Sequence, residues 1–161
     1  MSVREEQAML KRFLVAVDRL DPGGVLIEYA TQLAQLASGN VGVLHCIEFI
    51  GRGCAAPLES RAEANLLVED AVFRLRMAGV GSEGAIRSAL RKNVATLIVE
   101  ASEQWNADAI IVGSQHRRGL GRLIGHGVRE KVAKKSQMPV LVAPASSHPG
   151  QVGFLLPASA D

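Results

Sequence analysis

Apolar runs and amphipathic stretches alternate strictly along this chain of 161 residues. Five short runs rich in Val, Ile, Leu and Ala have the length of buried strands, and the stretches between them carry apolar residues at helical spacing. The strands are expected at residues 13–18, 41–49, 85–90, 108–113 and 139–144. Because a strand, a helix and a second strand in sequence require a crossover, the strands should be parallel. The sequence therefore predicts a single doubly wound α/β domain, with a five-stranded parallel sheet and helices on both faces.

The predicted domain fills most of the chain. It is expected to span residues 12–144, after an N-terminal lead of residues 1–11 and before a C-terminal tail of residues 145–161. The tail is rich in Ser, Pro, Gly and Ala, a composition typical of flexible segments. Within the domain, Asp21 and Pro22 are expected to cap and open the first helix. Asn93 is expected to cap the third helix, which runs through Trp105.

The composition excludes several classes of protein. With 48% hydrophobic residues, 21% charged residues and a net charge of +2, the chain is typical of globular domains and too weakly basic to indicate a nucleic-acid binder. Its two cysteines, Cys46 and Cys54, are too few for a disulfide framework or a four-ligand zinc site. No segment approaches the ~18 apolar residues of a membrane span, so a cytoplasmic protein without membrane contact is expected.

A candidate ligand site follows from the predicted sheet. In open α/β sheets, ligands bind outside the carboxyl ends of the strands, where the strand order reverses. Asp18 ends the first predicted strand, Cys46 lies late in the second, and Gly113 ends the fourth and opens a glycine-rich loop over residues 113–127. Glycines allow backbone amides at a helix N-terminus to surround an anion. On the residues alone, a mobile turn followed by a solvated basic helix face explains the same segment.

Several segments together resemble the universal stress proteins over residues 11–144. The segments that carry the resemblance are residues 15–18, 43–46, 107–114, 128–132 and 138–142. The resemblance implies a small α/β protein of the Rossmann-like, adenine nucleotide alpha hydrolase-like class, which commonly forms a dimer and in many members binds ATP. The implied cofactor is ATP or another adenine nucleotide, which Mg²⁺ could accompany.

The resemblance also assigns residues to the nucleotide. It places Ala16, Asp18 and Cys46 beside adenine and ribose, and Val112 and Gly113 near the sugar. By the same resemblance, the backbone amides of Gly127 and Val128 donate hydrogen bonds to phosphate.

The family's phosphate motif, G-x2-G-x9-G-S/T, is altered in this chain. Aligned from Gly113, the motif's second and third glycines fall on His116 and His126, and its hydroxyl residue falls on Gly127. A side chain in place of glycine predicts weaker ATP binding, because it limits the close approach of phosphate. Imidazole, however, donates hydrogen bonds to phosphate and becomes cationic in mild acid. We therefore hypothesise a site in which His116 and His126 flank the phosphates and affinity rises as the pH falls.

The function predicted from these features is a non-catalytic adenine-nucleotide binder or sensor of the stress-response type. The sequence contains no GxxxxGK(S/T), HExxH or GxSxG motif and no nucleophile with an evident base, so we do not expect an enzyme. A dinucleotide-dependent enzyme is a less favoured alternative, because the glycines of residues 119–125 do not follow the first strand. His45 and His148 have no neighbouring ligand pattern and are interpreted as a structural histidine and a tail histidine.

The main alternative is a dimeric interaction protein of the same fold that binds no nucleotide. The predicted final strand begins at Pro139 and reaches Ala143, and it is apolar enough to need cover. By the resemblance, this strand pairs with its copy in a second subunit, so a homodimer is expected. Direct DNA binding is not expected, because the basic residues lie in neither a helix-turn-helix nor a zinc pattern.

Overall fold

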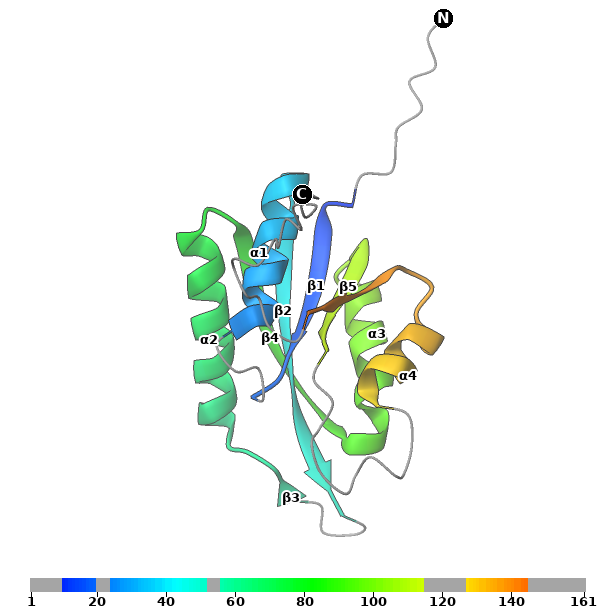
Figure 1. The fold of residues 1–161 in the computed structure, drawn as a ribbon. Helices are drawn as coiled ribbons and strands as arrows, with labels where there is room; N and C mark the ends of the chain where they lie inside the picture. Colours follow the sequence, from blue (N-terminus) through cyan, green and yellow to red (C-terminus); the bar gives the residue numbers. More distant parts are fainter. Residues whose placement is uncertain (1–9, 20–23, 52–55, 115–126, 145–161) are drawn as a thin grey trace, which may run out of the picture.

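The computed structural model describes residues 10–19, 24–51, 56–114 and 127–144. The elements in chain order are β1 (Arg12–Val17), α1 (Val25–Ala37), β2 (Asn40–Ile50), β3 (Ala56–Pro57), α2 (Arg61–Met77), β4 (Gly81–Leu90), η2 (Arg91–Asn93), α3 (Val94–Gln104), β5 (Ala109–Gly113), α4 (Val128–Lys135) and β6 (Val140–Ala143). The predicted alternation of strands and helices is confirmed, and Figure 1 shows how the elements are arranged.

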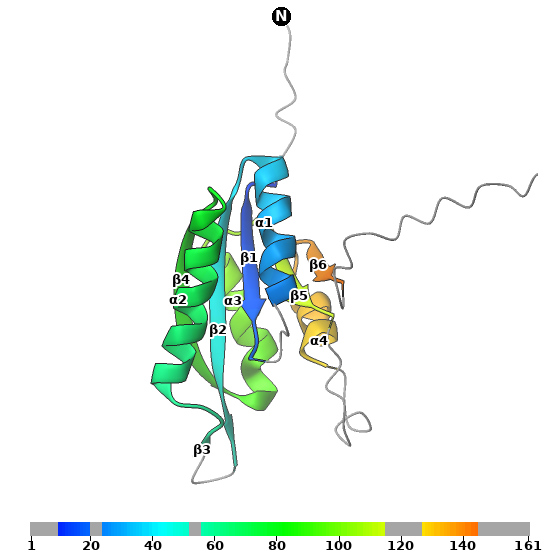
Figure 2. The same cartoon turned by 60° about the vertical axis from the view of Figure 1, so that its left-hand side comes forward.

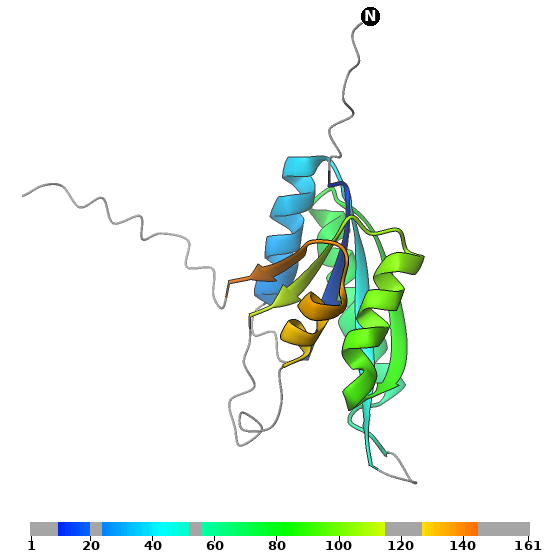
Figure 3. The same cartoon turned by 90° about the vertical axis from the view of Figure 1, so that its right-hand side faces the viewer.

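The sheet is mostly parallel, as predicted. Strand β1 pairs in parallel with β2 and β5, β2 pairs with β4, and β5 pairs with β6, which gives the order β4-β2-β1-β5-β6. The short strand β3, which the sequence analysis did not predict, pairs antiparallel with the end of β2. Helices α1 and α2 cover one face of the sheet, and α3 and α4 cover the other (Figures 2 and 3).

Two apolar clusters hold these layers together. Neighbouring residues of β1 point to opposite faces: Val15 belongs to the cluster under α1 and α2, and Leu14 to the cluster under α3 and α4. Leu75 of α2 and Val132 of α4 are fully buried, one in each cluster. Because burying a side chain of this size contributes roughly 1.5–3 kcal/mol, both faces of the sheet stabilise the fold.

Strand β4 begins four residues earlier than expected. The prediction started this strand at residue 85, but its pairing with β2 starts at Gly81. The extra segment contains Gly81 and Gly84, residues that weaken a strand pattern in a sequence. At Gly84 the glycine has a packing role, because a Cβ there would lie 2.3 Å from Val68 Cγ1 of α2. The missing side chain therefore allows α2 to approach the sheet closely.

The helix starts differ in how they are capped. The side chain of Ser60 accepts a hydrogen bond from the amide of Glu63, and the Glu63 carboxylate accepts one from the amide of Ser60, which is a complete capping box for α2. Asn93 is the N-cap residue of the third helix, as predicted, but its side chain makes no capping hydrogen bond. Helix η2 runs directly into α3, so Asn93 has a helical backbone rather than the extended backbone of a capping residue. Asp21 and Pro22 lie outside the described residues.

The strand order reverses between β1 and β5. From β1 the chain builds the sheet outward through β2 and β4, and then returns to the other side of β1 to add β5 and β6. A reversal of this kind leaves a crevice at the carboxyl ends of the two central strands. The topology therefore selects the ends of β1 and β5 as the place to look for a ligand site.

Candidate functional site

The central strands bring several of the predicted site residues together. Ala16 of β1 is level with Val112 of β5, and Cys46 follows directly after the last residue of β2 that pairs with β1. Cys46 and Val112 are buried in the cluster under α3 and α4, and Ala16 packs against it. Asp18 is exposed to solvent just beyond β1, and Gly113 is the last residue of β5. These residues therefore surround the carboxyl ends of the two strands.

The start of α4 is tied to the end of β5. Gly127 precedes the helix as its N-cap residue, and Val128 packs against the same apolar cluster as Ala16. The guanidinium of Arg129 donates a hydrogen bond to the carbonyl oxygen of Ser114, with a distance of 3.4 Å. This contact places the start of α4, whose first amides have no acceptor within the helix, next to the end of β5.

The charge at the start of α4 is balanced within the chain. The carboxylate of Glu130 lies 2.6 Å from the guanidinium of Arg129, so the one acid of the first turn has a cationic partner. Gly127 keeps this contact open, because a Cβ there would lie 2.7 Å from Glu130 Oε2. The helix terminus can thus present its amides without an unbalanced negative charge beside them.

The hydroxyl of Ser114 is a further polar group at this strand end. Its hydroxyl oxygen is buried and has no hydrogen-bond partner among the described residues. A buried hydroxyl without a partner is unfavourable, and such groups in native proteins call for an explanation. Ser114 follows β5 immediately, so this hydroxyl belongs to the same strand end as Gly113.

Cys46 is a core residue rather than a reactive thiol. Burial raises the pKa of the Cys46 thiol to about 12, and the negative charge of Glu48 adds to the effect. The thiol is therefore protonated near neutral pH and is a poor nucleophile there. Cys46 is therefore a small residue of the apolar core.

The remaining predictions concern other histidines, the second cysteine, metal binding and membrane spans. His116, His126, His148 and Cys54 lie outside the described residues. The described residues contain no group of three His, Cys, Asp or Glu side chains that could hold a metal ion. None of the helices in the described part of the chain is long and apolar enough to cross a membrane.

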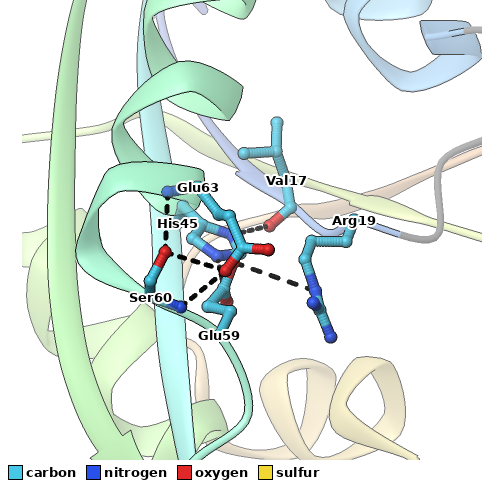
Figure 4. Close-up of polar contacts among 6 residues, drawn as sticks. All are labelled: Val17, Arg19, His45, Glu59, Ser60 and Glu63. Atoms are coloured by element: carbon cyan, nitrogen blue, oxygen red, sulfur yellow. Dashed lines mark hydrogen bonds and ion pairs between the residues drawn. The ribbon is translucent and has the colours of Figure 1, made fainter.

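A buried polar cluster beside this site was not predicted. His45 Nδ1 lies 2.9 Å from the carbonyl oxygen of Val17, and Nε2 lies 2.7 Å from Glu59 Oε1 (Figure 4). The side chains of His45 and Glu59 are each 4% exposed, and Arg19 Nε lies 3.8 Å from Glu59 Oε2. His45 is thus a structural histidine, as predicted. The roles of Glu59 and Arg19 were missed, although a histidine in an apolar strand indicates that a buried polar partner exists.

A match to a protein family extends over the whole predicted domain. The sequence model described as the universal stress protein family matches residues 9–144. The chain belongs to the universal stress protein family. The resemblance noted in the sequence is therefore confirmed, and so is the fold class that it implied.

Individual universal stress proteins agree with this assignment. Universal stress protein MJ0531 of Methanocaldococcus jannaschii is 26% identical over 147 residues, which cover 87% of this chain and 85% of that protein. The universal stress protein from Archaeoglobus fulgidus in complex with dAMP has a TM-score of 0.63 and 24% identity, over 84% of this chain and 99% of that one. A universal stress protein in complex with cAMP has a TM-score of 0.66 and 21% identity, over 86% of this chain and 100% of that one.

Proposed function

We propose that this universal stress protein binds an adenine nucleotide at the carboxyl ends of β1 and β5. The observation that carries the proposal is the meeting of two features at the point where the strand order reverses. The start of α4 is tied to the end of β5 through Arg129, and the buried hydroxyl of Ser114 beside it has no partner among the described residues. Two universal stress proteins of the same fold, solved with dAMP and with cAMP, support the choice of an adenylate.

The proposed contacts follow from the chemistry of each residue. Ala16, Cys46 and Val112 are proposed as the apolar residues beside the adenine ring, since they meet in one apolar cluster at the ends of the central strands. The carboxylate of Asp18 would accept a hydrogen bond from a ribose hydroxyl, since an ionised carboxylate is an acceptor only. Gly113, without a side chain, leaves room for the sugar beside β5.

Phosphate would be bound on the other side of the site. The amides of Gly127 and Val128 are proposed to donate hydrogen bonds to it, and the Ser114 hydroxyl would be a further donor. His116 and His126 remain proposed as side chains that flank the phosphates and strengthen binding at lower pH. Mg²⁺ belongs to the proposal only as an ion carried by the phosphates of ATP, its usual mode of binding to nucleotides.

The proposed role is reversible binding, as in a sensor or a carrier of the nucleotide, without chemical conversion. The two candidate nucleophiles of the strand ends are weak, because the Cys46 thiol is protonated and the Ser114 hydroxyl has no basic partner among the described residues. An enzyme of this fold would need an activated nucleophile or base at the same strand ends.

Calorimetric titration with dAMP, AMP and ATP tests the proposal. We expect saturable binding with a stoichiometry of one nucleotide per chain, and weaker binding of adenosine, which lacks the phosphate. Guanosine monophosphate is the control for recognition of the base. The absence of binding by all three adenylates at millimolar concentration would contradict the proposed function.

A second candidate function is dimerisation through β6, with or without a nucleotide. Strand β6 lies at one edge of the sheet, and its Val142 side chain is 42% exposed. An apolar edge strand is a template for pairing with another chain. We propose that two copies pair through this strand to form a homodimer.

A further inference from the structure

The hydrogen bonds of His45 determine how many protons its ring carries. The carbonyl oxygen of Val17 is an acceptor only, so His45 Nδ1 at 2.9 Å must carry a hydrogen. The second ring nitrogen, Nε2, lies 2.7 Å from a carboxylate oxygen of Glu59. A neutral imidazole has one N–H, and this one is used at Nδ1, so a second proton is needed between Nε2 and Glu59 Oε1.

The surroundings of Glu59 favour the ring as the place of this proton. The other carboxylate oxygen, Glu59 Oε2, is buried and accepts no hydrogen bond from the described residues. It lies 3.8 Å from Nε of Arg19, a side chain that is 47% exposed. A nearby guanidinium stabilises the ionised carboxylate, so the pair is best described as an imidazolium and a carboxylate.

The cluster holds the chain on both sides of Asp18. Val17, on one side, is bound by the ring of His45, and Arg19, on the other side, faces the carboxylate of Glu59 (Figure 4). Asp18 is the residue to which we assign the ribose contact. Asp18 is therefore flanked by one contact to the backbone of Val17 and one to the side chain of Arg19, both made by the cluster.

The same cluster reaches the start of α2. Glu59 immediately precedes Ser60, the N-cap of α2, and the capping box of Ser60 and Glu63 fixes the direction in which the helix begins. His45 lies next to Cys46, which we assign to the adenine-binding surface. The end of β1, the adenine side of the site and the start of α2 are thus joined by one buried ion pair.

We propose that His45 and Glu59 are positioning residues of the nucleotide site, and that they act as a doubly protonated imidazole paired with a carboxylate. This inference rests on the proposed function for its ligand, and it adds a role for two residues that do not touch the nucleotide. The pair fixes the segment from Val17 to Arg19 before the nucleotide arrives, so that less conformational freedom is lost on binding.

The variant Glu59→Gln separates charge from shape. Glutamine has nearly the same size, and its amide can donate a hydrogen bond to Nε2 of a neutral ring, so both bonds of His45 can persist without the extra proton. The negative charge that faces Arg19 is lost, however, and one anchor of the Asp18 segment is lost with it. We expect binding of dAMP to weaken roughly tenfold, the equivalent of one hydrogen bond to a charged group.

Nitrogen-15 spectra of the imidazole rings provide a readout that a merely structural role would not change. The chain has four histidines, so the His45→Asn variant identifies the signals of His45. At neutral pH we expect both ring nitrogens of His45 to carry protons in the unmodified protein, and one of them to carry a proton in Glu59→Gln. The matched control is Glu63→Gln, which removes a neighbouring carboxylate while keeping a capping-box residue; it should change neither the His45 signals nor the affinity for dAMP.

The outcomes distinguish this inference from the proposed function. If the unmodified protein binds dAMP and the affinity of Glu59→Gln is unchanged, the positioning role is wrong while the nucleotide site stands. A single protonated nitrogen on His45 in the unmodified protein would also overturn the inference, even if no adenylate binds. Should Glu59→Gln fail to fold, Arg19→Ala removes the second contact from an exposed position, and an unchanged affinity for dAMP in that variant would contradict the proposal.

Discussion

The indole ring of Trp105 packs closely against Gly42. A Cβ on Gly42 would lie 3.0 Å from two atoms of the ring, and the guanidinium of Arg12 is 4.2 Å from the ring centre. The indole N–H donates a hydrogen bond to Glu83 of β4. One aromatic side chain thus joins α3 to strands β1, β2 and β4, at the end of the sheet opposite the candidate site.

This contact predicts the effect of a single methyl group. Gly42→Ala should destabilise the fold by about 1–3 kcal/mol, because the added Cβ overlaps a ring that is held by Arg12 and Glu83. Urea denaturation measures the loss. In a double-mutant cycle with Trp105→Leu, the double variant should lose less stability than the sum of the losses in the two single variants. Strict additivity would show that the ring and Gly42 are not coupled.

The capping box of α2 predicts a pH-dependent stability. Hydrogen bonds from the amide and hydroxyl of Ser60 lower the pKa of Glu63 below its ordinary value. A lowered pKa in the folded state stabilises the fold above the pKa of the unfolded carboxyl, and this contribution is lost as the pH falls through the folded value. Ser60→Ala should cost about 1 kcal/mol at neutral pH, and the cost should shrink in acid. Thermal denaturation of both proteins across the acid range checks this, and a cost independent of pH would contradict it.

The buried thiol of Cys46 predicts slow chemical modification. Because its pKa is raised to about 12, the thiol of the folded protein should resist alkylation at pH 8 and react rapidly only after unfolding. The measurement uses a Cys54→Ser background, so that one thiol is followed by mass spectrometry. Rapid alkylation of the folded protein would show that Cys46 is more accessible than its burial implies.

The same raised pKa predicts how stability changes in alkali. The unfolded thiol ionises near pH 8.5, whereas the folded thiol keeps its proton to about pH 12, so stability should fall as the pH rises between these values. In Cys46→Ala this part of the alkaline loss should disappear, although the variant is less stable at neutral pH. An identical alkaline slope for both proteins would contradict the prediction.

The proposed nucleotide site predicts two distinct mutational effects. Asp18→Asn should weaken binding of AMP roughly tenfold at every pH, because an amide is a weaker acceptor for the ribose hydroxyl than a carboxylate. His116→Ala and His126→Ala should instead remove the gain in ATP affinity between pH 8 and pH 6. Calorimetric titration at both pH values separates the effects, and equal binding by the histidine variants throughout would exclude these side chains from the site.

The exposed edge of β6 predicts a dimer that a single charge disrupts. Val142→Asp should convert the protein to a monomer in sedimentation experiments, because a charge on an apolar edge strand opposes pairing. Leu36→Asp is the matched control, since Leu36 is an exposed apolar residue, 86% accessible, on α1 rather than on the edge strand. A concentration-independent monomer for the unmodified protein would rule out the proposed homodimer.

Much of the fold could be predicted because its strands are apolar and its helices have one apolar face. The run that contains Ile110 and Ile111 is buried on both sides, and such runs need no tertiary information to be found. The first half of β4 could not be predicted in this way. Its glycines and polar residues become a strand because β2 offers a complete ladder of partners, which is a property of the assembled sheet.

The candidate site was predictable only where it coincides with strand ends. Asp18 and Gly113 follow apolar runs, so their positions could be inferred from topology alone. The contact of His45 with Glu59 could not be inferred, because Glu59 is brought back toward His45 by the antiparallel pairing of β3 with the end of β2. Local sequence carries no signal for a two-residue strand such as β3, whose pairing depends on the neighbouring strand.

Strands β2 and β4 continue well past the point where β1 ends. Val17 is level with His45, yet β2 runs on to Ile50 and remains paired with β4 as far as Leu90 (Figure 1). At about 3.3 Å per residue, the five residues of β2 beyond His45 carry this part of the sheet roughly 16 Å past the end of β1. In the proposed site, a ligand bound beyond the end of β1 would therefore have this overhang on one side of it.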